Sequence, residues 1–201
     1  MSTRTFAVGI TGASGAIYAM RTMAALLECE CHLEVVVSEY GRRLLHDELG
    51  DKAAVPRLRE YLVETYGQAA SRGTFTVLSN KDLGATIASG SHDCEGMVIV
   101  PCSMKTLAGV AHGLSRNLVE RAADVMLKEK RRLVIVPRET PMSLPQLKNM
   151  VLCAEAGAML LPAMPAFYQQ PKTLADLSDF MAGKILSALG LSHDLYPKWQ
   201  G

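Results

Sequence analysis

The chain has 201 residues, of which 49% are hydrophobic and 20% are charged, and its formal net charge is +1. This length and this balance exclude a disordered chain and are typical of one globular domain, which we expect to span residues 1–201. The near-neutral charge gives no reason to expect a nucleic acid or a membrane surface as a partner.

Targeting and metal-binding patterns are absent from the sequence. The amino terminus lacks the long apolar stretch of a signal peptide, and no window approaches the ~20 apolar residues that span a bilayer, so we expect a cytoplasmic protein. The five cysteines form no CxxC pair and the five histidines show no HxxxH spacing. We therefore expect neither a disulfide framework nor a metal site.

Short apolar runs rich in β-branched residues alternate with amphipathic segments along the chain. The runs predict strands at Phe6–Ile10, Leu33–Val37, Thr74–Leu78, Met97–Val100, Leu133–Val136 and Met159–Leu161. The segments between them predict helices at Ile17–Leu27, Arg42–Leu49, Arg57–Tyr66, Leu107–His112, Leu118–Lys130, Leu144–Glu155 and Leu174–Leu189. The polar stretch from Gly50 to Arg72 is expected to be an irregular surface excursion.

The order of these elements predicts an α/β fold. Several strands are apolar throughout, as expected when both faces of a parallel sheet are buried. We therefore predict a doubly wound, open, mostly parallel sheet with helices on both faces, Rossmann-like or flavodoxin-like. Ligands of such sheets bind outside the carboxyl ends of the strands, so the segments that follow the strands are the candidate site.

The segment after the first strand, Thr11–Ala16, is rich in small residues. Its backbone N–H groups and the following helix favour an anion, and we interpret it as a phosphate cradle. A tight turn that needs glycine for geometry alone is the alternative. The glycine spacing is not GxGxxG, although Glu39 after the second strand keeps a dinucleotide site open, and no P-loop motif occurs.

Two further segments carry charged or hydroxyl side chains. After the fourth strand, Pro101–Thr106 combines hydroxyls with a lysine at an expected helix start, where Ser103 is a natural N-cap and Cys102 is a less favoured candidate thiol. Arg121, Asp124 and Lys128 lie at i, i+3 and i+7 and share one helix face, for which a solvated surface is the usual explanation.

Taken together, these segments resemble the flavin prenyltransferase family, the UbiX-like proteins. The resemblance runs essentially end to end and rests on Gly9-Ile10-Thr11-Gly12-Ala13-Ser14-Gly15-Ala16, Ala88-Ser89-Gly90-Ser91, Pro101-Cys102-Ser103-Met104-Lys105-Thr106, Arg121–Glu129, Pro137-Arg138-Glu139-Thr140-Pro141, Pro165-Ala166-Phe167-Tyr168 and Lys198-Trp199-Gln200-Gly201. It implies an enzyme that joins the dimethylallyl group of dimethylallyl phosphate to N5 and C6 of reduced FMN. The product, prenylated FMN, serves a UbiD-type (de)carboxylase, and the family is reported to form dodecamers with sites at subunit interfaces.

The resemblance also implies roles for individual residues. FMN would be held by Gly12, Ala13, Ser14, Ser38, Ser103, Met104, Lys105, Thr106 and Arg138. The prenyl phosphate would be surrounded by Arg121, Lys128, Glu139, Tyr168 and Lys184, with Trp199 as a π-rich wall. Catalytic roles would fall to Ser14, Glu48, Lys128 and Glu139, with Glu48 as a proton acceptor near N5. A solvated helix acid is the alternative for Glu48.

These roles are chemically consistent with a reaction that needs no metal. Fixed cations and donors stabilise the charge that develops on a leaving phosphate, and the acidic DDxxD pattern of magnesium-dependent prenyltransferases is absent. Four alternatives stay open: a peptidyl-cysteine decarboxylase on the same sheet, direct decarboxylation of aromatic acids, a non-catalytic FMN-binding or delivery subunit, and an NAD-dependent dehydrogenase.

Overall fold

The computed structural model describes residues 3–197, so Trp199 and the other residues of the carboxyl-terminal motif lie outside the described part. Within residues 3–197, six parallel strands form one sheet in the order β3-β2-β1-β4-β5-β6. The strands are β1 (Thr5–Ile10), β2 (His32–Val37), β3 (Thr74–Leu78), β4 (Gly96–Cys102), β5 (Arg132–Pro137) and β6 (Met159–Leu160). This is the order of the doubly wound nucleotide-binding folds, and the winding direction reverses between β1 and β4. The predicted α/β fold class is confirmed.

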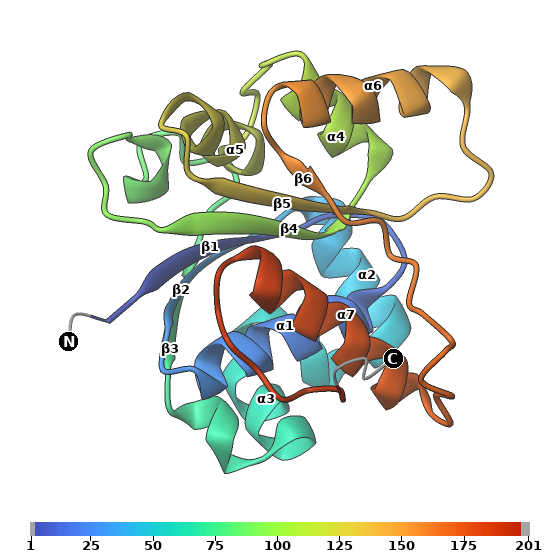
Figure 1. Ribbon diagram of the computed structural model, residues 1–201. Coiled ribbons are helices and arrows are strands. Elements are labelled where there is room, and N and C mark those ends of the chain that lie inside the picture. Colours follow the sequence, from blue (N-terminus) through green and yellow to red (C-terminus); the bar gives the residue numbers. More distant parts are fainter. Residues whose placement is uncertain (1–2, 198–201) are drawn as a thin grey trace.

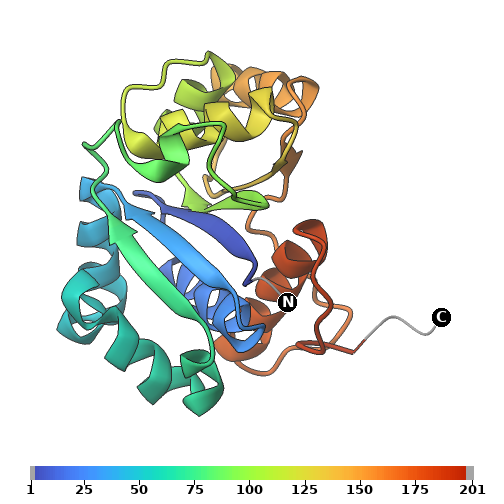
Figure 2. The same cartoon turned by 90° about the vertical axis from the view of Figure 1, so that its left-hand side faces the viewer.

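In the described part of the chain, seven α-helices cover the two faces of the sheet (Figure 1). They are α1 (Ala16–Glu28), α2 (Glu39–Leu49), α3 (Leu58–Tyr66), α4 (Met104–Ala111), α5 (Leu118–Lys128), α6 (Leu144–Glu155) and α7 (Leu174–Ala188). Helices α1, α2, α3 and α7 share one buried apolar cluster with the sheet, and α4, α5 and α6 share the other. Figure 2 shows the strands running between these two layers. No helix of the described residues is long and apolar enough to cross a membrane.

The strands are buried because helices pack on both of their faces. All seven residues of β4 and five of the six residues of β1 are buried. Register is continuous from Thr5 opposite His32 to Ile10 opposite Val37, which brings the ends of β1 and β2 to the same level. Parallel pairing thus places the loops that follow β1, β2 and β4 at one edge, on the right-hand side of Figure 1.

The region of residues 50–72 differs from the expected surface excursion. It contains α3 and three short 3-10 helices, at Asp51–Ala53, Val55–Arg57 and Gln68–Ser71. Leu58, Leu62 and Ala70 are completely buried and belong to the same apolar cluster as α1. The helix predicted at Arg57–Tyr66 is present as α3, and its buried face packs in the cluster of α1 while its exposed residues are polar.

Candidate active site at the carboxyl edge of the sheet

Helices α1, α2, α4 and α5 begin at the carboxyl edge, beside the point where the winding direction reverses. Side-chain caps fix the starts of α2, α4 and α5. The Ser38 hydroxyl accepts from the backbone N–H of Gly41 at 3.0 Å at the start of α2. The Ser103 hydroxyl accepts from the backbone N–H of Thr106 at 3.3 Å at the start of α4. Asn117 caps α5 in the same way. Helix N-termini carry partial positive charge, so this edge favours an anion.

Thr11 joins the loop after β1 to the loop after β4. Its buried hydroxyl donates to the carbonyl of Pro101 at 3.0 Å and accepts from the backbone N–H of Ser103 at 2.7 Å. The loop that bears Gly12, Ala13 and Ser14 and the loop that bears Ser103–Thr106 therefore keep a fixed spacing.

We predict that Thr11→Val lowers the free energy of unfolding by about 1–3 kcal/mol, because it leaves the Ser103 N–H unpaired at similar side-chain volume. Urea unfolding followed by circular dichroism measures this change. Thr76→Val, on the exposed side of β3, is the control and should change stability by no more than about 0.5 kcal/mol. A Thr11→Val protein as stable as its control would contradict this structural role.

A cavity of ≈280 Å³ lies between these loops and the helix starts. Its lining includes five residues that the resemblance implies for FMN (Gly12, Ser38, Ser103, Lys105 and Thr106), together with Glu39, Tyr40, Asn80, Asn117 and Glu120. A Cβ atom on Gly12 would lie 2.5 Å from Cβ of Tyr40, so only glycine lets the first loop approach α2 this closely. The donor set of hydroxyls, one ammonium group and helix N-termini fits the phosphate and ribityl chain of FMN.

Sequence reasoning missed three polar residues of this cavity. Asn80 follows β3, so the argument that ligands bind after the strand ends could have predicted it. Its Oδ1 accepts from the backbone N–H of Val119 at 3.2 Å. The buried carboxylate of Glu120 accepts from the backbone N–H of Arg116 at 3.0 Å, and Asn117 caps the same helix.

Glu48 lies on α2, and its carboxylate binds the backbone N–H groups at the start of α1. Although exposed, its carboxylate accepts from the backbone N–H of Gly15 at 3.0 Å and from that of Ala16 at 2.7 Å. The amides at the start of α1 therefore already have an anionic partner, and the cavity draws on α2, α4 and α5. This changes the expected role of the first loop, whose helix was predicted to face the phosphate directly. The same geometry places Glu48 next to Ser14.

Arg138 and Glu139 follow β5 on the other side of the first loop. The Arg138 guanidinium donates from Nε to the carbonyl of Ser14 at 3.2 Å. Glu139 accepts from the backbone N–H of Thr140 at 3.0 Å and is partly exposed. Ser14, Glu48 and Arg138 are thus brought together around one loop.

Cys102 is not available as a thiol nucleophile. Its side chain is completely buried, and burial raises the pKa of its thiol far above the ordinary value. The thiolate is the nucleophilic form of cysteine, so the alternative of a catalytic Cys102 is wrong. In the described residues, no group of three or more His, Cys, Asp or Glu side chains is arranged to hold a metal ion.

Four of the five residues predicted for the prenyl phosphate fall into two sets on opposite faces of the sheet, and the fifth, Glu139, follows β5 at the edge. Arg121 and Lys128 lie on α5, where Arg121 pairs with Asp124 at 2.9 Å and Lys128 pairs with Glu129 at 3.0 Å. The Lys128 ammonium lowers the pKa of the Glu129 carboxyl. Lys184 lies on α7, below the sheet in Figure 1, whereas α5 lies above it. One chain therefore does not bring both sets together.

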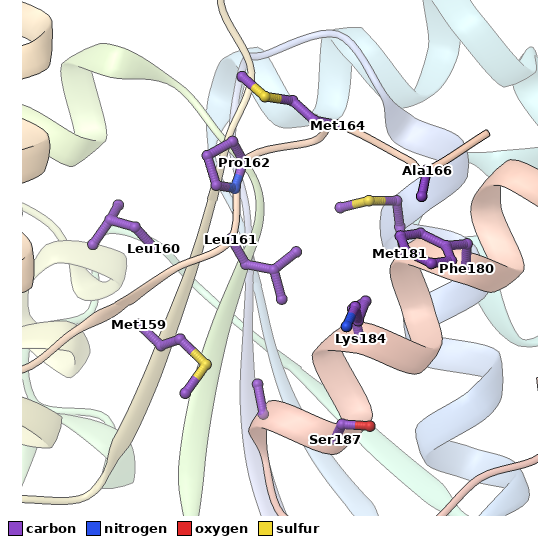
Figure 3. Close-up of a pocket in the computed structure, with 11 residues that line it drawn as sticks. Met159, Leu160, Leu161, Pro162, Met164, Ala166, Phe180, Met181, Lys184 and Ser187 are labelled. Atoms are coloured by element: carbon purple, nitrogen blue, oxygen red, sulfur yellow. The ribbon is translucent and has the colours of Figure 1, made fainter. Parts of the chain in front are cut away.

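Lys184 faces a second, larger cavity between α7 and the segment around β6. This cavity of ≈600 Å³ is lined by Met159, Leu160, Leu161, Pro162, Met164, Ala166, Phe180, Met181, Lys184, Ser187 and Ala188. Figure 3 shows the Lys184 ammonium beside Phe180, whose ring centre lies 5.9 Å from Nζ. Tyr168 lies nearby, with its ring centre 6.2 Å from that of Phe180, and is about half exposed. An apolar cavity with one cation suits a small apolar group that carries a phosphate.

The fold and this polar strand-end site define a nucleotide-binding protein of the flavoprotein class, and the model of the Flavoprotein family matches residues 1–186. Flavin prenyltransferase UbiX of Halalkalibacterium halodurans is 46% identical over 198 residues, covering 96% of this chain and 92% of that protein. The chain belongs to the flavin prenyltransferase family.

Two solved structures agree with this assignment. The crystal structure of AnUbiX (PadA1) in complex with FMN and dimethylallyl pyrophosphate is 35% identical, with a TM-score of 0.88 and coverage of 100% of this chain and 99% of that chain. The dodecameric FMN-dependent UbiX-like decarboxylase from Escherichia coli O157:H7 is 37% identical, with a TM-score of 0.85 and coverage of 98% and 100%.

Proposed function

We propose that this enzyme transfers the dimethylallyl group of dimethylallyl phosphate to N5 and C6 of reduced FMN, and that a UbiD-type (de)carboxylase receives the prenylated FMN. The observation that carries the proposal is the cavity at the carboxyl edge, where α2, α4 and α5 begin beside Lys105 and the first loop. The relative crystallised with FMN and dimethylallyl pyrophosphate, similar over the whole chain, supports it.

FMN would be held by the two loops that Thr11 joins. Ser38, Ser103 and Lys105 line the cavity and would contact its phosphate and ribityl groups, with Thr106 in the same lining. Gly12, Ala13, Ser14, Met104 and Arg138 would border the ring system from the first loop and the ends of β4 and β5. When bound, reduced FMN supplies nucleophilic N5 and C6 atoms.

The cations of α5 and α7 would hold the prenyl phosphate. Preorganised positive charge stabilises a leaving phosphate without a metal. Because Arg121 and Lys128 lie on the opposite face of the sheet from Lys184 and Tyr168, one phosphate would contact both sets only where two subunits meet. We therefore propose a homo-oligomer with shared sites. One similar protein is described as dodecameric.

Proton transfer would involve the carboxylates beside the first loop. Glu48 lies next to Ser14 through its bonds to Gly15 and Ala16, and it would accept the proton released as the flavin is alkylated. Glu139, on the segment whose Arg138 contacts Ser14, would take part at the same place.

Product formation with each of two donors tests the proposed function. Purified protein is incubated without oxygen with reduced FMN and either dimethylallyl phosphate or diphosphate, and the flavin is then separated by chromatography. We expect a new flavin with at least one donor. Unmodified FMN with both donors, from correctly assembled protein, would contradict the proposal, and carbon dioxide release from an aromatic acid without added partner would favour the decarboxylase alternative.

Chelation is expected to leave the rate unchanged. The leaving phosphate would be stabilised by Arg121, Lys128 and Lys184, so excess EDTA should alter initial velocity by less than about twofold. Magnesium is added back as the control. Strong inhibition by EDTA that magnesium reverses would show that cation side chains alone do not carry this step.

A further inference from the structure

The buried carboxylate of Glu34 on β2 binds both ends of the loop of residues 86–92. Oε1 of Glu34 accepts from the Thr86 hydroxyl at 2.7 Å, and Nε2 of His92 donates to Oε2 at 2.6 Å, since a carboxylate only accepts. Glu34 is 6% exposed and lies in a strand whose other core residues are apolar. Burying a carboxylate costs free energy unless it is paired, so Glu34 depends on these two hydrogen bonds and ties them to the loop.

The same loop is held from the opposite side by Arg131. Its two terminal nitrogens donate to the carbonyls of Gly90 at 2.7 Å and His92 at 2.8 Å. Within the loop the hydroxyls of Ser89 and Ser91 lie 2.9 Å apart. The loop is therefore fixed at its apex as well as at its ends.

This loop contacts both cations of α5. The Arg121 guanidinium donates from Nε to the carbonyl of Ala88 at 3.2 Å. A Cβ atom on Gly90 would clash with the Glu129 carboxylate and lie 3.1 Å from Nζ of Lys128, so the loop packs directly against the Lys128–Glu129 pair. The position of the loop thus sets the positions of Arg121 and Lys128.

We propose that Glu34 and His92 are positioning residues that hold the loop of residues 86–92 against α5 and thereby aim Arg121 and Lys128 at the prenyl phosphate. This inference rests on the proposed function, because it assigns the two cations to that phosphate. Misplacing a binding group by about 1 Å weakens the interaction strongly, even when the changed residue is distant from the substrate.

Three variants test the proposal in the full, assembled protein. Glu34→Leu removes both hydrogen bonds, whereas Glu34→Gln keeps an oxygen for Thr86 and an amide that donates to His92 in its other tautomer. Leu62→Ala, on the buried face of α3, is the control that lowers stability far from the loop. Calorimetry measures binding of dimethylallyl phosphate to protein loaded with oxidised FMN, where no transfer occurs.

We expect Glu34→Leu to raise the dissociation constant of dimethylallyl phosphate about 10- to 100-fold and to leave that of FMN unchanged. Glu34→Gln should bind within about threefold of the wild type. Amide hydrogen exchange at Ser89 and His92 should be faster in Glu34→Leu only, because their N–H groups donate within this loop. Leu62→Ala should lower the melting temperature without changing either dissociation constant.

Two results would overturn the inference. One is normal binding of dimethylallyl phosphate by Glu34→Leu. The other is an equal loss of this binding in Leu62→Ala when the two variants are equally stable. If Glu34→Leu does not fold, Thr86→Val removes one of the two bonds and must still weaken binding about threefold. The proposed function fails separately, if the wild type neither binds dimethylallyl phosphate nor alters FMN. Wild-type transfer together with normal binding by the variants would refute only the positioning role.

Discussion

An equal mixture of Arg121→Met and Lys184→Met subunits is expected to regain prenyl transfer that each variant lacks. Each substitution removes one cation from the leaving phosphate and should lower the transfer rate about 100- to 1,000-fold. In randomly reassembled oligomers, about a quarter of the sites would receive an intact Arg121 from one subunit and an intact Lys184 from another. Formation of prenylated flavin is assayed after the two variants are coexpressed or refolded together.

The reason for this expectation is the sheet itself. Arg121 lies on α5, which shares a buried apolar cluster with α4 and α6, whereas Lys184 lies on α7, which shares the cluster of α1 on the other face. Two cations separated in this way meet at one phosphate only between chains.

The control is an equal mixture of either single variant with the Arg121→Met/Lys184→Met double variant, which contains no pair of intact partners. It should stay as inactive as the single variants. FMN binding, measured by fluorescence quenching, should be normal in all of them. A mixture of the two single variants that is no more active than this control would contradict a site shared between subunits.

Glu48→Gln should separate catalysis from helix capping. A glutamine side chain still offers an oxygen to the N–H groups of Gly15 and Ala16, so the start of α1 keeps a partner. It cannot accept a proton at neutral pH, and the turnover number should fall about 100- to 10,000-fold. Glu48→Ala should show the same loss of turnover and an additional loss of about 0.5–2 kcal/mol in the free energy of unfolding.

Asp47→Asn is the matched control, because Asp47 lies next to Glu48 on α2 and forms ion pairs with Arg43 and His46. Its turnover should equal that of the wild type. Stopped-flow absorbance of the flavin gives the turnover number of each variant. Normal turnover in Glu48→Gln would identify Glu48 as a helix cap alone.

The strand positions and the sheet class could be predicted from the sequence because buried parallel strands need continuous apolar runs. Thr74–Leu78 agrees with β3 at both ends, and the other predicted strands differ by one or two residues at an end. Helix starts were less accurate. Helix α2 begins at Glu39 instead of Arg42, because Ser38 caps a first turn that carries polar residues. Helix α4 begins at Met104, three residues before the predicted Leu107, and directly follows the N-cap that was predicted at Ser103.

The candidate site could be predicted where it follows the strand ends and not where it depends on tertiary contacts. Gly12, Ser38, Ser103 and Lys105 follow strands, and the structure brings them to one cavity. Nothing in the sequence shows that Glu48 reaches the start of α1, or that Glu34 inside β2 meets His92 across 58 positions. The α3 helix was predicted to within one residue, but its burial was missed because its few buried leucines stand among charged residues.

The mass of the flavin extracted after one reaction tests the central claim most directly. The wild-type protein, reduced FMN and dimethylallyl phosphate are incubated without oxygen, and the flavin is analysed by mass spectrometry with donor carbon-13 labelled in the dimethylallyl group. We predict a flavin heavier by one labelled five-carbon unit, with labelled carbons bonded to N5 and C6 by nuclear magnetic resonance. Recovery of FMN at its original mass, with the donor intact, would contradict the account.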